Sequence, residues 1–273
     1  MASIAAYLVT HAATVQALFY GAFIVSCWCV EQVFLGDHDG RKQRRARING
    51  WFVVTALPIQ VGLSLVCVWA AYEVTLHQWG LLYWLPWHNS VWVKYVLMFV
   101  LLDFLDWLYH YTMHHVPVFW RFHLVHHTDR AMDASTTVRE HPGETAIRNG
   151  FLIMWVVLCG ASIEVLMLRQ AAESASNILA HTSFRLRDRT AQVLGWLLIT
   201  PNLHHVHHHQ ARPYTDSNYG DVFSVWDRLF GTFATLRAED TVFGLDTHMK
   251  ADGDERFGSA FALPFKRRGD ATA

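Results

Sequence analysis

The sequence predicts an all-α fold: a multi-pass membrane helical bundle that carries a cytoplasmic, histidine-rich helical cap. Composition is the first indication, because 52% of the 273 residues are hydrophobic, 12 are tryptophan and only 16% are charged, whereas soluble domains carry about 25% charged residues. The second indication is a set of four long apolar stretches. The third is that 13 of the 18 histidines lie between His110 and His209.

The four apolar stretches cover residues 4–34, 51–71, 91–108 and 151–168. Each reaches or approaches the length of roughly 20 residues that a membrane-spanning helix needs. Helices buried in a large soluble protein would give the same pattern, but four of them are difficult to bury in one short chain. We therefore expect about four membrane-embedded segments in a single domain, divided into residues 1–108, a histidine-rich region at 109–237 and a tail at 238–273.

The loops between these stretches predict the orientation. Residues 41–47 include five basic side chains, which places this expected loop in the cytoplasm. Residues 77–89 are rich in Trp and Tyr and contain no Lys or Arg, as is typical of an outer interface. The third span then returns inward, so the histidines begin on the cytoplasmic side, and in a bacterium the membrane would be the plasma (inner) membrane.

The segment from residue 151 to residue 181 is too long for one span. Its 31 residues would make a helix of about 46 Å, which exceeds a bilayer core of about 30 Å. Gly160 and Ser162 lie near its middle, so we expect a membrane hairpin near residues 151–181 that brings His181 back to the cytoplasmic side. The apolar residues 191–199 are too few to span and are expected at the interface.

The histidines fall into spaced groups. His110 and His114 form an HxxxH pair, residues 123–127 read HxxHH, and His181 follows a helical run. Residues three and four apart share a helical face, and neutral imidazole is the commonest ligand for transition metals. One zinc ion takes about four ligands, so nine spaced histidines suit two ions. The net charge of -1 argues against a nucleic-acid partner.

The last group, residues 204–209, holds five histidines and has two possible registers. His204, His207 and His208 make one HxxHH pattern, and His205, His208 and His209 make another. Both place the three rings at i, i+3 and i+4, so helix geometry alone does not choose between them.

Several motifs together resemble the fatty acid hydroxylase/sterol desaturase superfamily of integral-membrane diiron enzymes. They are His110-x-x-x-His114, residues 120–127 (WRFHLVHH), residues 139–142 (REHP), Asn177-x-x-x-His181, residues 200–208 (TPNLHHVHH) and residues 215–232. The resemblance covers about residues 103–232 and reaches the first two spans only in their hydrophobic character.

The resemblance implies a ligand set and a reaction. A Thr-Pro pair precedes the third box in the family pattern, which selects the first register. The implied metal ligands are His110, His114, His123, His126, His127, His181, His204, His207 and His208. They would hold two Fe ions, with Zn as a substitute in purified protein, and Asn177 stands where some relatives have a further histidine. The implied reaction is O2-dependent hydroxylation or desaturation of a lipid C–H bond, with electrons from a separate ferredoxin, cytochrome b5-like protein or flavoprotein reductase.

Carboxylates near the histidines are candidates for positioning or catalysis, because a metal-bound histidine usually donates its other N–H to a carboxylate or carbonyl. Asp103 and Asp106 lie seven and four residues before His110, and carboxylates at the end of a span are costly unless they have a role. His141 is a third catalytic candidate. Further choices are Glu140, Glu144, Asp216 and Asp227.

Two other functions are compatible with many histidines in a membrane protein. A metal transporter or metal-binding protein would place ligands along its spanning helices, and here they lie at or beyond the cytoplasmic ends. A membrane cytochrome with two histidines on each haem would need a few pairs at mid-membrane depth, not HxxHH clusters. The sequence therefore favours the oxidoreductase.

Overall fold

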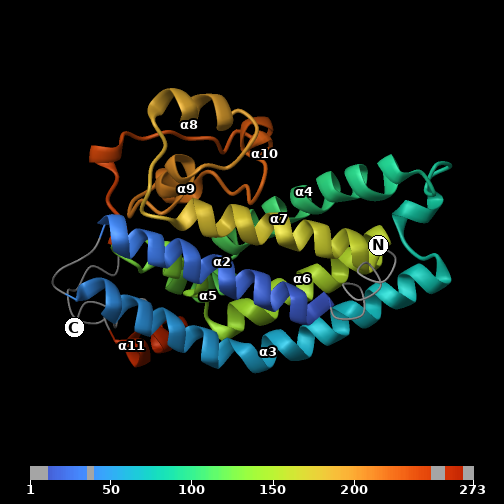
Figure 1. Ribbon diagram of the computed structural model, residues 1–273, viewed down its shortest axis with the longest axis horizontal. Helices are drawn as coiled ribbons and strands as arrows, with labels where there is room; N and C mark the ends of the chain where they lie inside the picture. The colour runs from blue at the N-terminus through green and yellow to red at the C-terminus, as the bar shows by residue number, and fades with distance from the viewer. Residues whose placement is uncertain (1–11, 36–39, 247–255, 267–273) are drawn as a thin grey trace.

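The computed structural model describes residues 12–35, 40–246 and 256–266, and within these ranges the protein is all-α, as the sequence predicts. Figure 1 shows long helices running along the molecule with short helices gathered toward one end. The expected first span and the C-terminal tail lie partly outside the described residues. Three histidines, His11, His38 and His248, lie entirely outside them.

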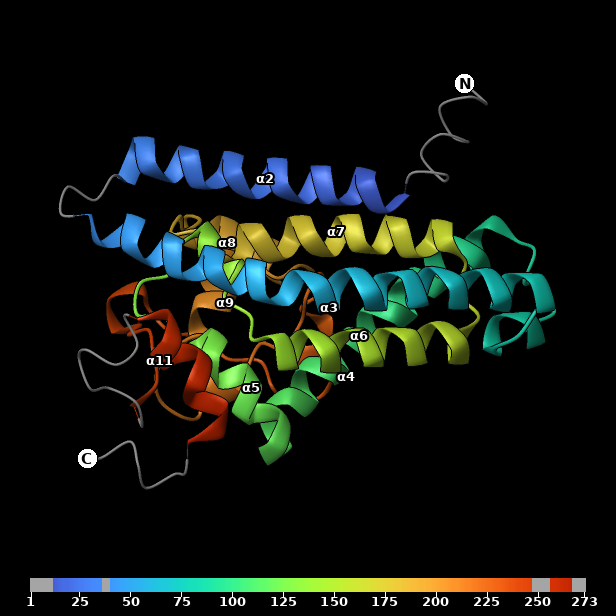
Figure 2. The ribbon, with the colours of Figure 1, turned by 90° about the horizontal axis from the view of Figure 1, so that it is seen from below.

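Five long helices form the body of the described part of the chain. They are α2 (Ala12–Leu35), α3 (Arg41–His77), α4 (Met98–His115), α6 (Pro142–Cys159) and α7 (Ile163–His181). Helix α2 packs against α7 and α3 packs against α6, so that these four helices lie side by side (Figure 2). A π-helical segment, η2 (Trp92–Leu97), leads directly into α4.

Short helices complete the end of the molecule where α4 and α7 finish. They are α5 (Pro117–His127), η3 (Ala134–Val138), α8 (Asp188–Leu194), α9 (Pro201–His207), η4 (Tyr214–Asp216), α10 (Val225–Leu229), η5 (Ala238–Asp240), α11 (Phe257–Ala262) and η7 (Leu263–Phe265). Proline at the first turn begins α5, α6 and α9, where its fixed φ suits a helix and its missing N–H costs nothing. Thr200 caps α9 by accepting a hydrogen bond from the Leu203 N–H.

The turn between α6 and α7 is tight and depends on glycine. Gly160 ends α6 with φ of 78°, a conformation that favours glycine. A Cβ atom added there would lie 2.5 Å from the Trp79 carbonyl oxygen, and one added at Gly80 would lie 2.3 Å from the Gly160 nitrogen. Residues 151–181 thus belong to two helices that reverse at Gly160, which is the break that a hairpin requires.

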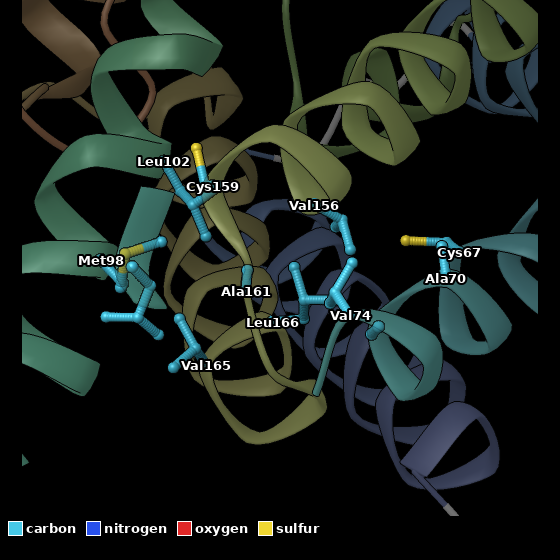
Figure 3. Close-up of a cluster of buried hydrophobic side chains, with 12 residues drawn as sticks. Cys67, Ala70, Val74, Met98, Leu102, Val156, Cys159, Ala161, Val165 and Leu166 are labelled. Carbon is cyan, nitrogen blue, oxygen red and sulfur yellow. The ribbon is translucent and has the colours of Figure 1, made fainter. Parts of the chain in front are cut away.

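A hydrophobic core joins four of the long helices at the end where this turn lies. Figure 3 shows Val74 from α3, Leu102 from α4, Val156 from α6 and Leu166 from α7 among its buried side chains. These residues lie on the inward stripe of each helix, as expected for amphipathic packing. The polar and histidine-rich half of the molecule begins beyond this core.

The basic stretch at residues 41–47, which we expected to be a loop, instead forms the first two turns of α3. A run of Arg and Lys has good helix propensity, and its charge is partly neutralised by tertiary contacts. Arg45 lies 3.6 Å from Asp129 and 3.9 Å from Asp133. The start of α3 is therefore tied to the segment that follows α5.

Within the described residues, one helical stretch, residues 42–84, is long and apolar enough to cross a membrane. Only 11% of its most apolar window is buried, whereas the core helix of a soluble protein would be mostly buried. Residues 18–34 form a shorter apolar helix. The other two expected spans are divided between elements, since residues 91–108 lie in η2 and α4 and residues 151–168 are interrupted at Gly160.

Candidate metal centre

All nine histidines that the family pattern selects come together in the structure, in two adjacent groups. In each group the candidate ligand atoms lie within 4.8 Å of one another, and every one of these residues is buried. Group one consists of His110, His114, His123, His127 and His207, and group two consists of His126, His181, His204 and His208. They come from α4, α5, α7, α9 and the residue directly after α9. In the sequence, His208 lies 98 positions after His110.

The two HxxHH motifs divide between the groups in opposite ways. On α5, the i and i+4 residues His123 and His127 belong to group one, and His126 belongs to group two. At α9, the i and i+4 residues His204 and His208 belong to group two, and His207 belongs to group one. Each motif therefore links both groups, and the rings of His127 from group one and His208 from group two stack with their centroids 4.4 Å apart.

Hydrogen bonds to the outer nitrogens orient four rings of group one. His110 Nδ1 lies 2.9 Å from the Tyr219 carbonyl oxygen, and His207 Nδ1 lies 2.7 Å from that of Ser217. Because a carbonyl oxygen only accepts, Nδ1 carries the proton in both rings and Nε2 keeps its lone pair. The other two rings face carboxylates: His123 Nδ1 is 2.6 Å from Glu144, and His114 Nδ1 is 3.2 Å from Asp216.

In group two the same kind of contact orients one ring among the described residues. His181 Nδ1 lies 2.8 Å from the Asn177 carbonyl oxygen. Nε2 of His181 then faces Nε2 of His126 and of His204, each at 3.0 Å. Asn177 contributes its backbone carbonyl to this contact.

The donor set fits metal ions. The Nε2 atoms of His110, His114 and His207 are buried without a hydrogen-bond partner, and burying such an atom without a partner is costly. Burial lowers the pKa of His110 and His123 to about 3, so their rings are neutral, which is the form that binds metal. Converging neutral nitrogens with oriented outer N–H groups are what a transition-metal site requires.

The remaining histidines of the 204–209 run lie outside both groups. Nε2 of His205 lies 2.8 Å from the Thr182 carbonyl oxygen, and Nδ1 of His209 accepts a hydrogen bond from the Val242 N–H. This placement supports the first register, in which His204, His207 and His208 are the ligands.

The three residues expected to have catalytic roles contact neither group through a hydrogen bond. Asp103 accepts hydrogen bonds from the Val222 N–H and the Trp226 indole. Asp106 forms an ion pair with Arg169. His141 caps α6 by accepting from the Gly143 N–H and packs against aromatic rings. The outer partners of the histidines are instead Glu144 and Asp216, which were among the further choices, and backbone carbonyls.

Asp227 holds the loop that supplies two of those carbonyls. Its carboxylate is fully buried and accepts hydrogen bonds from the Tyr219 and Gly220 N–H groups, the Trp107 indole and the Thr232 hydroxyl, at 2.7 to 3.0 Å. The loop from Ser217 to Gly220 is thereby fixed against α4. Asp227 acts on the histidines only through this loop, which a sequence pattern does not reveal.

Arg139 fixes the C-terminal end of α5 through several side-chain hydrogen bonds. Its buried guanidinium donates hydrogen bonds to the Val125 carbonyl, the Thr128 hydroxyl and the Asn49 amide oxygen. A planar group with five donors can satisfy several acceptors in fixed directions. The C-terminal turn of α5, with His126 and His127, is thus fastened to α3.

The fatty acid hydroxylase family matches residues 95–232, a range that contains every histidine of both groups and the loop held by Asp227. The chain belongs to the fatty acid hydroxylase family. This membership confirms the resemblance that the histidine motifs indicated.

Individual relatives share less than a third of their residues with this chain over the matched regions. The chain is 31% identical to an alkylglycerol monooxygenase of Caenorhabditis elegans over 65% of this chain and 34% of that protein. It is 28% identical to the ornithine lipid hydroxylase OlsE of Rhizobium tropici, over 68% of this chain and 56% of the relative. Against the alkylglycerol monooxygenase of Homo sapiens it is 29% identical over 68% of this chain and 38% of that protein. These matches thus span from a third to just over half of the relatives' lengths, and no solved structure matches the chain.

Proposed function

We propose that the protein is a membrane-bound, O2-dependent diiron oxidoreductase that hydroxylates a C–H bond of a lipid. The observation that carries the proposal is the convergence of nine buried histidines in two adjacent groups, in each of which the candidate ligand atoms lie within 4.8 Å of one another. Neutral ligands leave the positive charge of two ions largely uncompensated, which favours anions derived from dioxygen. The named activities of the relatives, monooxygenase and hydroxylase, favour hydroxylation over desaturation.

Group one and group two would each hold one iron ion. The iron would supply the reduction of O2 and the oxidising power that breaks an unactivated C–H bond. The protein holds the ligand rings in one orientation through Glu144, Asp216 and the carbonyls of Ser217 and Tyr219. It also buries the centre, since every ligand side chain is at most 9% exposed. Electrons would come from a separate ferredoxin, cytochrome b5-like protein or flavoprotein reductase.

The exposed surface of α3 supports a membrane location. Apolar and aromatic side chains recur along it at intervals of three or four residues, which makes one continuous stripe. They are Trp51, Val54, Leu57, Val61, Leu65, Trp69, Tyr72 and Leu76, each more than half exposed. Such a stripe is unfavourable in water and suits hydrocarbon. We propose that the bundle is embedded in the bilayer several times and that the histidines lie at its cytoplasmic end.

Aromatic residues at the two ends of the bundle support the same arrangement. Trp84, Trp87 and Trp92 are at least 71% exposed near the Gly160 turn, and Trp196 is 68% exposed after α8, beside the histidine-bearing helices. Tryptophan is enriched at both faces of a membrane. The three tryptophans near the Gly160 turn would mark the outer interface, and Trp196 would mark the inner one.

Purified protein reconstituted in nonionic detergent tests the proposal. We expect about two irons per chain, no haem spectrum, and O2 uptake that depends on a reductant and yields a lipid alcohol. A histidine-rich transport protein would instead move metal across proteoliposomes without consuming O2. That result, or a chain that takes up haem, would overturn the proposal. Comparing the lipids of cells with and without the gene would identify the substrate.

A further inference from the structure

A second polar feature is a cavity of about 40 Å³ that is lined by residues of α3, α4, α6, α7 and the loop at Asp221. This volume has room for about three water-sized groups. Its lining includes Tyr109 from α4, Arg148 from α6 and Glu173 from α7. A polar cavity of this size is filled by water or by a polar ligand.

The ion pairs at the cavity leave an excess of negative charge. Arg169 contacts both Asp106 and Glu173, and Arg148 lies 3.0 Å from Glu140. The carboxylate of Asp221 forms no hydrogen bond or ion pair with another described residue. The cavity is thus lined by three carboxylates, those of Asp106, Glu173 and Asp221, and by two guanidinium groups, and a cation bound there would offset the difference when all are ionised.

Tyr109 provides an independent indication of a ligand. Its side chain lines the cavity, the residue is 8% exposed, and its hydroxyl is buried with no hydrogen-bond partner in the described structure. The ring is fixed against Phe151, 5.5 Å away, which also lines the cavity. Buried phenol hydroxyls usually have a partner, and here a ligand donor would supply it.

Three segments of the chain connect the lining of the cavity with group one. Tyr109 directly precedes His110 in α4. Arg148 lies one turn after Glu144, the partner of His123. Asp221 is two residues after Tyr219, whose carbonyl accepts from His110. Three segments that line the cavity therefore also carry a residue that belongs to group one or contacts it.

We propose that this cavity binds the ammonium group of an amine-bearing lipid, which is the substrate of the reaction proposed above and is oxidised at a carbon near that group. An ammonium donates hydrogen bonds, which Asp221, Glu173 and the Tyr109 oxygen accept. A phosphate has the wrong charge for a lining rich in carboxylates. This inference rests on the proposed function and narrows its substrate class.

The test measures head-group preference on iron-loaded, full-length protein in nonionic detergent. Hexylamine, hexanol and hexyl phosphate are titrated calorimetrically, so that chain length is constant and only the head group changes. We expect hexylamine to bind at least about 10-fold more tightly than hexanol, which is the contribution of one charge-assisted hydrogen bond. Hexyl phosphate should bind more weakly than either.

Variants connect the preference to the cavity. Glu173→Gln and Asp221→Asn should each weaken hexylamine binding about 10-fold while hexanol binding and iron content stay the same. Tyr109→Phe should weaken it less. Glu239→Gln, a carboxylate whose side chain is 64% exposed, is the matched control and should change nothing.

The outcomes separate this inference from the proposed function. Equal affinity for amine and alcohol, or an amine preference unaffected by Glu173→Gln and Asp221→Asn, would overturn the inference while iron content and O2 uptake still test the enzyme. Conversely, a protein that prefers amines but neither holds iron nor consumes O2 would leave a cation-binding cavity without the proposed reaction, and would also end its assignment as a substrate site.

Discussion

The two histidine groups differ in how firmly their rings are held. Group one has five histidines, four of which are oriented by Glu144, Asp216 or a backbone carbonyl. Group two has four histidines, and among the described residues only His181 has such a partner. Outer partners fix ring orientation and increase metal affinity. The comparison teaches that two neighbouring sites built from the same motifs need not hold their ions equally.

The difference has a structural origin. The loop between η4 and α10 folds back over α4 and α9 and presents its carbonyls to His110 and His207, while Glu144 projects from the first turn of α6 toward His123. No comparable segment of the described chain reaches His204 or His208. We therefore expect the ion of group one to be bound more tightly than that of group two.

The largest expected effect is the loss of a ligand from group two. His208→Ala leaves three histidines, so iron content should fall from about two per chain to about one and activity should drop at least about 100-fold. His207→Ala leaves four histidines in group one, enough for a four-coordinate ion, and should retain more of its iron. Metal analysis after dialysis checks both variants. A greater loss of iron in His207→Ala would reverse the ranking of the two groups.

The second effect is on metal release from the unaltered protein. A chelator should remove iron in two phases, with the ion of group two leaving first because fewer partners fix its ligands. His204→Ala should abolish the fast phase and keep the slow one. Stopped-flow absorbance of the chelator complex measures both phases. Release of both ions in a single phase from the unaltered protein would show that the groups do not differ.

A third, smaller effect concerns the carboxylate behind group one. Glu144→Ala should weaken iron binding about 10- to 100-fold, and Glu144→Gln should weaken it less because the amide oxygen still accepts from His123. The slow phase of release should become faster and the fast phase should not change. Asp227→Asn should act in the same direction through the loop that contains Tyr219. If either variant speeds the fast phase instead, the assignment of partners to groups is incorrect.

The smallest effects are expected at the two histidines outside the groups. His209→Ala should leave iron content unchanged, because His209 only accepts from the Val242 N–H. His205→Ala removes a buried hydrogen bond to Thr182 and should lower the free energy of unfolding by about 1 kcal/mol without removing iron. Metal analysis and thermal unfolding measure the two effects. A loss of iron in His205→Ala or His209→Ala would favour the second register.

Much of this site followed from local rules. Positions three and four apart on one helix must face the same side, so the HxxxH and HxxHH spacings were sufficient to identify candidate ligands before any fold was known. The excess length of residues 151–181 and the glycine near their middle were likewise sufficient to predict a reversal. Choosing between the two registers at residues 204–209 needed the family resemblance, because both satisfy the same helical geometry.

The sequence by itself determined the helical class, the apolar segments and the histidine spacings, since each depends on contacts within one or two turns. It assigned the basic residues 41–47 to a loop, whereas they begin α3 and contact Asp129 and Asp133, more than eighty residues away. Only the tertiary structure decided which histidines share a group, that Asp106 pairs with Arg169, and that backbone carbonyls of Ser217 and Tyr219 orient ligands. A carbonyl exists at every position, so its role is set by packing and not by side-chain identity.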